Sequence, residues 1–329
     1  MKISSISLLF LVFISKTLLA GSHVPLKFNY QGEFKIVQFT DTHISMVGSS
    51  NLKSFEVIRS VLVTEKPDLV VLTGDIVTEP DPTEGYKRLD SLFTRNNIPW
   101  VVVFGNHESE HQLSRYSLAR IVEKMQGCLN ADVGEIQGNS NFMLPIMGSH
   151  QKTAAILFCI DSNAYSTLKP KVGGYGWFDY SQIEWYRKSS LANTLQNGGK
   201  PLPSLAFFHI PLPEYTQAFI QKSGKSVGVR NEDESCPEIN SGMFTAMITC
   251  GDVMGTFVGH DHLNDYITVF HNIALAYGRV SKIMKDVEDP VAGGRIIILK
   301  EGKREFDTWI REFNGNKVLP CSYPSSFQH

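Results

Sequence analysis

The sequence lacks several features that would define a class of protein by themselves. Its 31 lysines and arginines are balanced by 33 aspartates and glutamates, for a net charge of −2, and it contains no strongly basic stretch. This balance disfavours nucleic acid or an anionic membrane surface as the main partner. Cysteine is scarce and odd in number, at five residues, which argues against a disulfide scaffold and allows at most two internal bridges. N-glycosylation sequons, internal repeats and low-complexity tracts are also absent.

The composition that is present belongs to a globular chain. With 42% hydrophobic and 11% aromatic residues, the sequence is too apolar for a disordered protein, and it is neither collagen-like nor coiled-coil in pattern. Its 329 residues can form one large α/β domain or two ordinary ones. Because no stretch resembles an interdomain linker, we expect a single domain over residues 23–329.

The amino-terminal segment has the pattern of a secretory signal peptide. Lys2 precedes an apolar run over residues 6–14, and small residues follow at positions 20–22. This run is too short to cross the ~30 Å core of a bilayer, although an amino-terminal strand or an uncleaved anchor would also fit. We predict a signal peptide over residues 1–22 and, since no other apolar stretch is long, a mature chain without a transmembrane segment. Such a protein would be secreted or lumenal, as in the secretory pathway, a vacuole or a lysosome-like compartment.

A short apolar run that leads directly to aspartate, asparagine or histidine recurs five times. The runs cover residues 34–39, 69–72, 100–104, 205–208 and 256–258, and the polar residues that follow them are Asp41 and His43, Asp75, Asn106 and His107, His209, and His260 and His262. Such runs are typical of buried strands. Because ligands gather beyond the carboxyl ends of parallel strands, we expect one site built from five separate segments.

Helical and antiparallel patterns complete the expected fold. Between the first strands, apolar residues recur at helical spacing over residues 52–62, 86–93 and 118–125, which favours a largely parallel α/β arrangement. In the last third, runs joined by glycine-containing or polar turns favour antiparallel pairing; they cover 266–271, 273–277, 295–299 and 306–313. We therefore predict an α/β fold in which two mixed β-sheets pack face to face with helices outside both.

The residue types at these strand ends suit transition-metal ions. Imidazoles, carboxylates and one amide form a mixed nitrogen and oxygen set that suits Fe, Zn or Mn and suits Ca poorly. Seven candidate ligands exceed the need of one ion and suffice for two if a carboxylate bridges them. Two ions roughly 3.5–4 Å apart would clamp the attacking and leaving oxygens of a phosphoryl displacement and lower the pKa of a bridging water. A neighbour that is not a ligand, such as His107, could protonate the leaving oxygen or stabilise the phosphate charge.

Five motifs in this order resemble those of the calcineurin-like metallophosphoesterase superfamily. They are Asp41-x-His43, Gly74-Asp75, Gly105-Asn106-His107-Glu108, His209 and Gly259-His260-x-His262. The segments 207–211 (FFHIP) and 259–265 (GHDHLND) are further similar to the small single-domain relatives of the purple acid phosphatases in plants and fungi. This resemblance implies a four-layer α/β/β/α sandwich that forms one catalytic domain.

The resemblance also implies a role for each motif residue. The first metal ion would be bound by Asp41, His43 and His262, and the second by Asn106, His209 and His260. Asp75 would bridge the two ions, and His107 would serve the leaving group or the phosphate.

One departure from the purple acid phosphatases concerns the metal. In those enzymes a tyrosine stands three positions after the bridging aspartate and a glycine closes the first motif, whereas this sequence has Thr78 and His43 at these positions. A tyrosinate favours a ferric ion and a neutral imidazole does not. We therefore expect two divalent ions, without the purple charge-transfer colour.

These observations lead to the hypothesis of a secreted or lumenal phosphatase that hydrolyses small phosphomonoesters through a dinuclear metal centre and a metal-activated hydroxide. Two alternatives stay open: a phosphodiesterase of nucleotide or sphingolipid type that uses the same site, and a metal-stabilised binding module without catalysis. Glu108 and Asp161 are candidates for carboxylates that orient an imidazole. Tyr175, Trp177 and Tyr180 are candidates for residues that line a substrate cleft.

Overall fold

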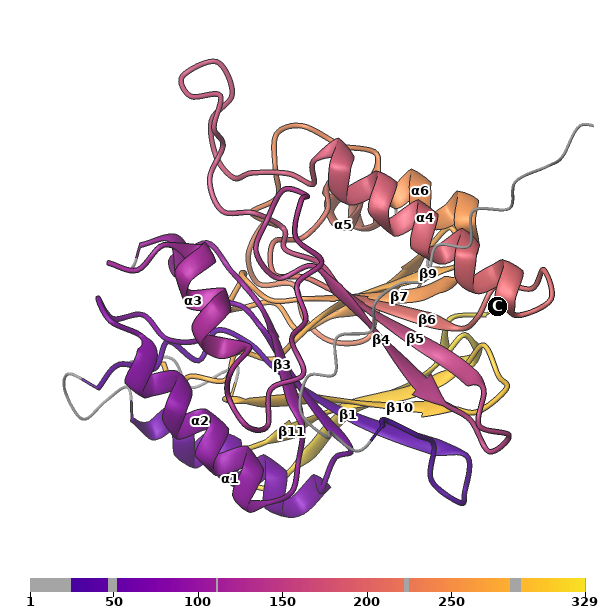
Figure 1. Ribbon diagram of the computed structural model, residues 1–329, viewed down its shortest axis with the longest axis horizontal. Coiled ribbons are helices and arrows are strands. Elements are labelled where there is room, and N and C mark those ends of the chain that lie inside the picture. The colour runs from indigo at the N-terminus through magenta and orange to yellow at the C-terminus, as the bar shows by residue number, and fades with distance from the viewer. Residues whose placement is uncertain (1–24, 47–51, 111, 222–224, 285–290, 329) are drawn as a thin grey trace, which may run out of the picture.

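The computed structural model describes residues 25–46, 52–110, 112–221, 225–284 and 291–328. The signal peptide predicted over residues 1–22 lies outside the described residues. Within them, twelve strands form two six-stranded sheets, with helices on the outer face of each (Figure 1). No helix in this part of the chain combines the length and the apolar character that crossing a membrane requires.

The first sheet combines the amino-terminal strands with the last three strands of the chain. It consists of β1 (Glu33–Phe39), β2 (Leu69–Thr73), β3 (Trp100–Val103), β10 (Gly293–Lys300), β11 (Phe306–Glu312) and β12 (Lys317–Tyr323), in the spatial order β12-β11-β10-β1-β2-β3. β1, β2 and β3 run parallel. β10 lies antiparallel to β1, with Ile297 opposite Ile36, and β11 and β12 continue the antiparallel pairing. The antiparallel pairing predicted for residues 295–299 and 306–313 is confirmed.

The second sheet has a parallel centre and antiparallel edges. It consists of β4 (Phe142–Met147), β5 (Thr153–Cys159), β6 (Ser204–Phe207), β7 (Val253–Val258), β8 (Ile267–Phe270) and β9 (Ile273–Tyr277), in the spatial order β4-β5-β6-β7-β9-β8. β5, β6, β7 and β9 run parallel, and β4 and β8 are antiparallel to their neighbours.

Two strands that the sequence does not predict, β4 and β12, both contain a proline. Pro145 lies in β4 and Pro320 in β12, and each of these strands is at the edge of its sheet. A proline lacks the N–H that a central strand must donate, so it argues against a strand in the sequence but is tolerated at an edge.

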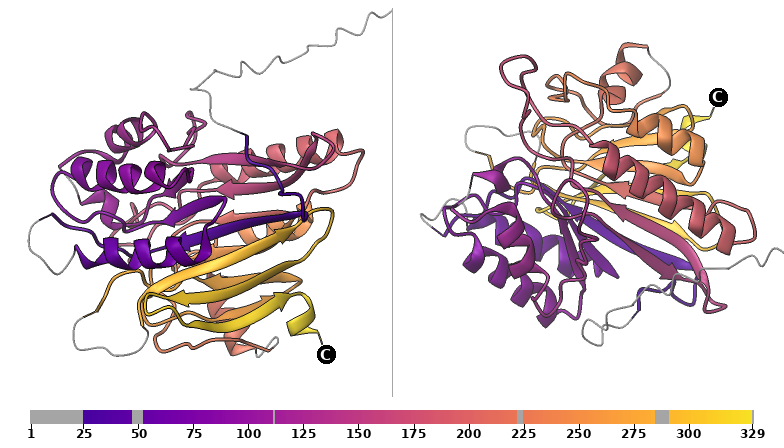
Figure 2. Two further views of the ribbon diagram at one scale, coloured as in Figure 1. Left: turned by 90° about the horizontal axis from the view of Figure 1, so that it is seen from below. Right: turned by 45° about the horizontal axis from the view of Figure 1, so that its top comes forward.

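The helices cover the two outer faces and make the molecule four layers deep. The first sheet is covered by α1 (Lys53–Glu65), α2 (Thr83–Arg95) and α3 (Arg115–Val122), and the second by α4 (Tyr180–Gln196), α5 (Pro213–Ile220) and α6 (Met243–Cys250). Figures 1 and 2 show both sheets between these two helical layers. Two short 3₁₀ helices, η1 (His107–Ser109) and η2 (Ser325–Phe327), follow β3 and β12.

Successive side chains of a strand pack on opposite faces of its sheet, which explains the four layers. In β1, Ile36 packs in the core between the two sheets, whereas the next residue, Val37, packs in the core beneath the helices of the first sheet. Ile156 and Leu157 of β5 alternate in the same way in the second sheet. Strands that are buried on both faces need apolar residues at successive positions, which is the pattern the sequence shows. The predicted α/β/β/α sandwich is confirmed.

A buried glutamine joins the two sheets next to the polar strand ends. The Nε2 of Gln38 in β1 donates to Thr73 Oγ1 at the end of β2 and to the carbonyl oxygen of Val258 at the end of β7. Beyond these residues, the backbone N–H of Asp41 donates to Gly74, and that of Gly259 donates to His209. The carboxyl ends of strands from both sheets therefore meet at one edge of the sandwich.

The cysteines contribute to packing and form no disulfide in the described part of the chain. Three are buried, and Cys236 and Cys250 are partly exposed. Cys159 lies in β5, within the core between the sheets, and burial raises the pKa of its thiol. A thiol of this kind is unreactive.

Candidate metal centre

Six of the seven residues expected to bind metal lie together with His107 at the edge where the two sheets meet. Their side chains fall into three overlapping groups whose ligand atoms are within 4.8 Å of one another: Asp41, His43 and His262; His43, Asp75 and His107; and Asp75, His209 and His260. Asp75 belongs to two of these groups, which is the place that a bridging ligand needs. Asn106 lies in the same loop as His107, directly after β3.

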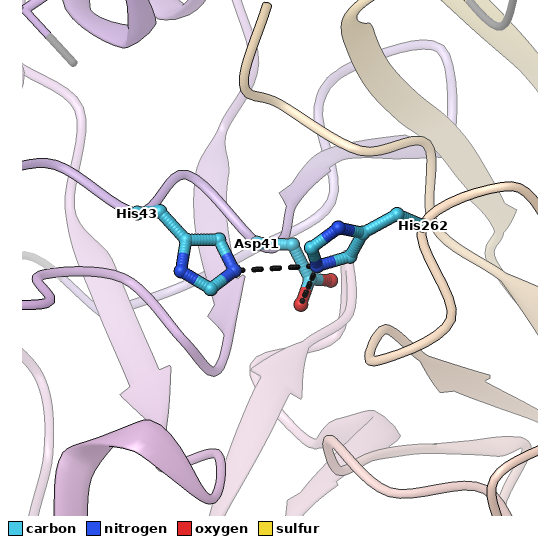
Figure 3. A group of neighbouring side chains, drawn as sticks. All are labelled: Asp41, His43 and His262. Carbon is cyan, nitrogen blue, oxygen red and sulfur yellow. Dashed lines mark hydrogen bonds and ion pairs between the residues drawn. The ribbon is translucent and has the colours of Figure 1, made fainter. Parts of the chain in front are cut away.

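The first group is formed by the loop after β1 and the loop after β7. Figure 3 shows His43, Asp41 and His262 pointing toward one another. The Nε2 atoms of His43 and His262 are 3.2 Å apart, and His262 Nε2 is 3.4 Å from Asp41 Oδ1. Two donor atoms that each lie about 2.1 Å from a tetrahedral ion are about 3.4 Å apart. These three atoms therefore have the spacing of ligands to one ion.

The group of Asp75, His209 and His260, called the second group below, brings together the loops after β2, β6 and β7. His209 Nε2 is 3.1 Å from Asp75 Oδ2 and 3.3 Å from His260 Nδ1. His209 Nε2 is also 4.0 Å from Asp41 Oδ1 of the first group. The two groups are thus adjacent.

Hydrogen bonds fix the ligand atoms from behind. The Nδ1–H of His209 donates to the carbonyl oxygen of Thr73 at 2.7 Å, which directs Nε2 toward the cluster. The Oδ2 of Asp41 accepts from Thr40 Oγ1 at 2.6 Å and from the backbone N–H of His260 at 2.9 Å. The Oδ1 of Asp75 accepts from the backbone N–H of His107 at 2.9 Å. Each carboxylate therefore uses one oxygen for the fold and keeps the other for the cluster.

Three buried polar atoms of the cluster have no hydrogen-bond partner within the described residues. They are Asp41 Oδ1, Asn106 Oδ1 and His260 Nε2. Buried polar atoms are normally hydrogen-bonded, and an unpaired one is costly. The carboxylate oxygen and the amide oxygen are atoms that a divalent cation accepts as ligands, so the residues present fit a metal site.

The electrostatics of the cluster also favour cations. Burial lowers the pKa of His43 to about 4 and that of His260 to about 3, so both rings are neutral at physiological pH. Burial alone would raise the pKa of Asp75, but the charge of His209 outweighs it and lowers the value to about 2. The site therefore offers an ionised carboxylate at Asp75 and neutral imidazole lone pairs at His43 and His260.

The backbone at the cluster is strained. Asp41, His43, Asp75 and His260 have φ angles of 52°, 40°, 53° and 79°, which residues with a side chain rarely adopt. Such conformations concentrate at functional sites, where the surrounding structure holds them. The loop after β3 also packs closely against Asp75. Position 105 must be glycine, because a Cβ there would fall on Asp75 Oδ1.

His107 stands beside the cluster with one face open. Its Nε2 is 3.8 Å from Asp75 Oδ2, and its Nδ1 is 2.7 Å from Glu110 Oε2. The side chain is 36% exposed, so a substrate can reach the ring. This is the position expected for a residue that serves the phosphate or the leaving group.

Two further residues near the cluster were not found from the sequence. Tyr165, in the loop between β5 and α4, donates its O–H to Glu110 Oε1 at 2.6 Å and accepts from Asn106 Nδ2 at 3.2 Å. Burial and the bond to Glu110 raise the pKa of Tyr165 to about 12. Neither Tyr165 nor Glu110 follows a strand directly, so no local pattern marks them.

Of the aromatic residues considered for a cleft, Tyr175 lies closest to the cluster. Its ring meets His260 edge-on, with the centroids 4.4 Å apart. Trp177 lines a neighbouring pocket of about 210 Å³ together with Tyr165. Tyr180 is 85% exposed and points to solvent at the start of α4.

Glu108 and Asp161 were candidates for carboxylates that orient an imidazole. Within the described residues, neither of them bonds to a histidine ring. Asp161 accepts from Arg115 Nη2 at 2.5 Å and from the backbone N–H groups of Asn139 and Asn163. Arg115 in turn donates to the carbonyl oxygen of Gly105. Asp161 therefore supports the loop after β3 through an arginine.

Glu108 is fully buried and holds the backbone of two loops. Its carboxylate accepts from the backbone N–H groups of Asp75, Ile76 and Gly105 at 2.7–2.9 Å and from the hydroxyl of Tyr86 at 3.2 Å. It thereby ties the loop after β2 to the loop after β3, which fixes the backbone of Asp75 rather than any ring.

Replacing Glu108 by alanine should lower the free energy of unfolding by about 3 kcal/mol or more, because several buried donors lose their acceptor at once. Chemical denaturation of the metal-free chain measures this effect. Glu84→Ala is the matched control, since Glu84 only pairs with Arg88 on the exposed face of α2 and should leave stability nearly unchanged. A loss below about 1 kcal/mol for Glu108→Ala would contradict this role.

The comparisons with known proteins agree with this geometry. The family model described as "Calcineurin-like phosphoesterase" matches residues 34–264. "Probable inactive purple acid phosphatase 29" of Arabidopsis thaliana is 33% identical over 311 residues, which cover 82% of this chain and 79% of that protein. "Phosphatase DCR2" of Saccharomyces cerevisiae is 31% identical over 267 residues, which cover 72% of this chain and 45% of that protein.

A solved structure shows the same fold. The dimetal phosphatase from Danio rerio superposes with a TM-score of 0.61 at 13% identity, covering 88% of this chain and 98% of that one. At this identity the likeness concerns the fold alone, so the family rests on the sequence matches. The chain belongs to the calcineurin-like phosphoesterase family and is related there to the plant proteins named as purple acid phosphatases.

Proposed function

We propose that this protein is a metal-dependent phosphatase that hydrolyses phosphomonoesters. The observation that carries the proposal is the convergence of ligand-type side chains from five strand ends into three overlapping groups, two of which contain Asp75. Residues 23–329 would form its single catalytic domain, and the signal peptide over residues 1–22 would direct it to a secreted or lumenal location.

In this proposal the site holds two divalent ions. The first ion would be held by Asp41, His43 and His262, the second by Asn106, His209 and His260, and Asp75 would contact both. When bound, two such ions supply positive charge for the phosphate and a water of lowered pKa. The unpaired Oδ1 atoms of Asp41 and Asn106 support this assignment.

His107 would act on the leaving group or the phosphate. Glu110 occupies its Nδ1, so Nε2 is the nitrogen that faces the cluster. From there it can donate a proton to the leaving oxygen or a hydrogen bond to the phosphate as negative charge develops.

Both metal ions should be divalent. Without a tyrosinate ligand, the protein should lack the purple charge-transfer colour. Thr78 stands where purple acid phosphatases have the ligand tyrosine, and the O–H of the neighbouring Tyr165 is committed to Glu110. An active, iron-loaded preparation should therefore lack the strong visible band of an iron–tyrosinate. Absorption spectroscopy checks this, and a strong band of that type would contradict it.

A second candidate is a metal-binding module without catalysis. The observation that favours it is the name "probable inactive" given to the plant relatives at 32–33% identity. Against it, the residues assigned here to both ions and His107 are all present in this chain.

One experiment distinguishes the candidates. The protein is loaded with Mn²⁺, Zn²⁺ or Fe²⁺, and its hydrolysis of p-nitrophenyl phosphate is compared with that of bis(p-nitrophenyl) phosphate. Monoester turnover that a chelator abolishes would support the proposal. Preference for the diester would replace it with a phosphodiesterase. No turnover of either ester by a chain with bound metal would favour the binding module.

A further inference from the structure

The loop between β5 and α4, residues 160–179, contacts the candidate metal centre through Tyr165 and Tyr175. Tyr165 and Tyr175 of this loop form an antiparallel bridge, and their rings stack with centroids 5.9 Å apart. The ring of Tyr175 packs on His260, and the phenol of Tyr165 bonds to Asn106. The loop thus contacts two residues assigned to the second ion, one through each tyrosine.

The direction of the hydrogen bonds around Tyr165 follows from Glu110. A phenol has one hydrogen and an ionised carboxylate can only accept, so Tyr165 donates to Glu110 Oε1 at 2.6 Å. The phenol oxygen is then an acceptor toward Asn106, whose Nδ2 donates to it at 3.2 Å. This bond turns the amide nitrogen of Asn106 toward the tyrosine and leaves Oδ1 as the unpaired atom of the cluster.

The same carboxylate orients His107. Its other oxygen, Oε2, is 2.7 Å from His107 Nδ1, which must carry the hydrogen because the carboxylate has none to give. The opposite nitrogen, Nε2, is thereby directed to the side of Asp75. One glutamate therefore determines how a candidate ligand and the candidate proton donor present their atoms.

We infer that Tyr165 and Glu110 are positioning residues of the metal centre, which hold the Asn106 amide with its oxygen toward the second ion, and that Glu110 also holds the ring of His107. This inference rests on the proposed function of the site. Phenylalanine at position 165 keeps the ring stack with Tyr175 but lets the amide rotate. Glutamine at position 110 keeps the shape but can donate to Tyr165, which reverses the chain of hydrogen bonds.

The test is Mn²⁺ binding to the metal-free full chain by isothermal titration calorimetry. Tyr165→Phe and Glu110→Gln are compared with Tyr180→Phe and Glu184→Gln, because Tyr180 is 85% exposed and Glu184 only pairs with Lys188 on α4. We expect the wild type and both controls to bind two ions. Tyr165→Phe and Glu110→Gln should bind one ion unchanged and the other about 10- to 100-fold more weakly, the usual effect of losing a group that orients a ligand. Circular dichroism of the metal-free variants verifies that they fold.

Binding of both ions by Tyr165→Phe and Glu110→Gln with wild-type affinity would overturn the inference, and so would equal weakening of both ions. A wild-type chain that binds no ion would overturn the metal site and the inference together. The binding measurement uses no ester. A chain that binds two ions but hydrolyses no ester would therefore refute the proposed phosphatase, and the calorimetry would still decide the roles of Tyr165 and Glu110.

Discussion

Replacing Asp75 by asparagine should lower phosphomonoester turnover by at least about 10³-fold and leave at most one metal ion bound. The physical reason is that Asp75 belongs to two overlapping groups of ligand atoms, one with His43 and His107 and one with His209 and His260. Its Oδ1 accepts from the backbone of His107, and its Oδ2 lies 3.1 Å from His209 Nε2. An asparagine carries no charge, so its amide oxygen holds two adjacent cations much more weakly than the carboxylate oxygen does. Charge stabilisation by bound metal contributes several kcal/mol to such reactions, which corresponds to a loss of this size.

The measurement for Asp75→Asn combines steady-state kinetics with metal analysis of the same sample. Asp307→Asn is a suitable control, because Asp307 pairs with Lys300 between β10 and β11 and belongs to none of the ligand groups. We expect this control to keep both ions and its activity. An Asp75→Asn chain that binds two ions and turns over at a rate near that of the wild type would show that Asp75 is not the bridging ligand.

Replacing His107 by alanine should lower kcat by about 10²- to 10⁴-fold, the range expected for an acid–base residue, while both ions stay bound. The contact of this residue with Asp75 Oδ1 comes from its backbone N–H, which alanine retains. The ring itself is partly exposed and reaches the cluster only from the side, with Nε2 3.8 Å from Asp75 Oδ2. The substitution therefore removes the proton donor without removing a support of the ligands.

Kinetics and metal content of His107→Ala again decide the outcome, with His150→Ala as the control, since His150 is exposed in the turn between β4 and β5. Full activity in His107→Ala would exclude the role given to the ring. Loss of one ion together with activity would instead make His107 a ligand, as its presence in a group with His43 and Asp75 allows.

The positions of most strands along the chain and the residues at their ends could be predicted because both are local properties of the sequence. A run such as residues 69–72 is apolar at every position, and Asp75 follows it within three residues, so the strand and the carboxylate after it can be predicted together. Parallel packing then places these ends at one edge without further information. The pairing of β1 with β10 could not be predicted in this way, because it joins segments more than 250 residues apart, Glu33 opposite Lys300 among them.

The parts of the site that the sequence did not reveal depend on side-chain directions in loops. Glu108 follows His107 directly, yet the 3₁₀ turn at this point directs its carboxylate to the backbone of Asp75 and Gly105. Tyr165 meets Asn106 across 59 residues of chain, through a loop with no periodic pattern. Contacts of this kind arise from the packing of the two sheets and leave no trace in local spacing.

The number of metal ions bound per folded chain tests the central claim most directly. It is measured by elemental analysis after the metal-free protein has been saturated with Mn²⁺ or Zn²⁺ and freed of excess ion. The overlap of the ligand groups through His43 and Asp75 predicts two ions for the wild type and no more than one for Asp75→Asn. Saturation of the wild type with a single ion, or with none, would contradict the dinuclear centre on which the proposed phosphatase depends.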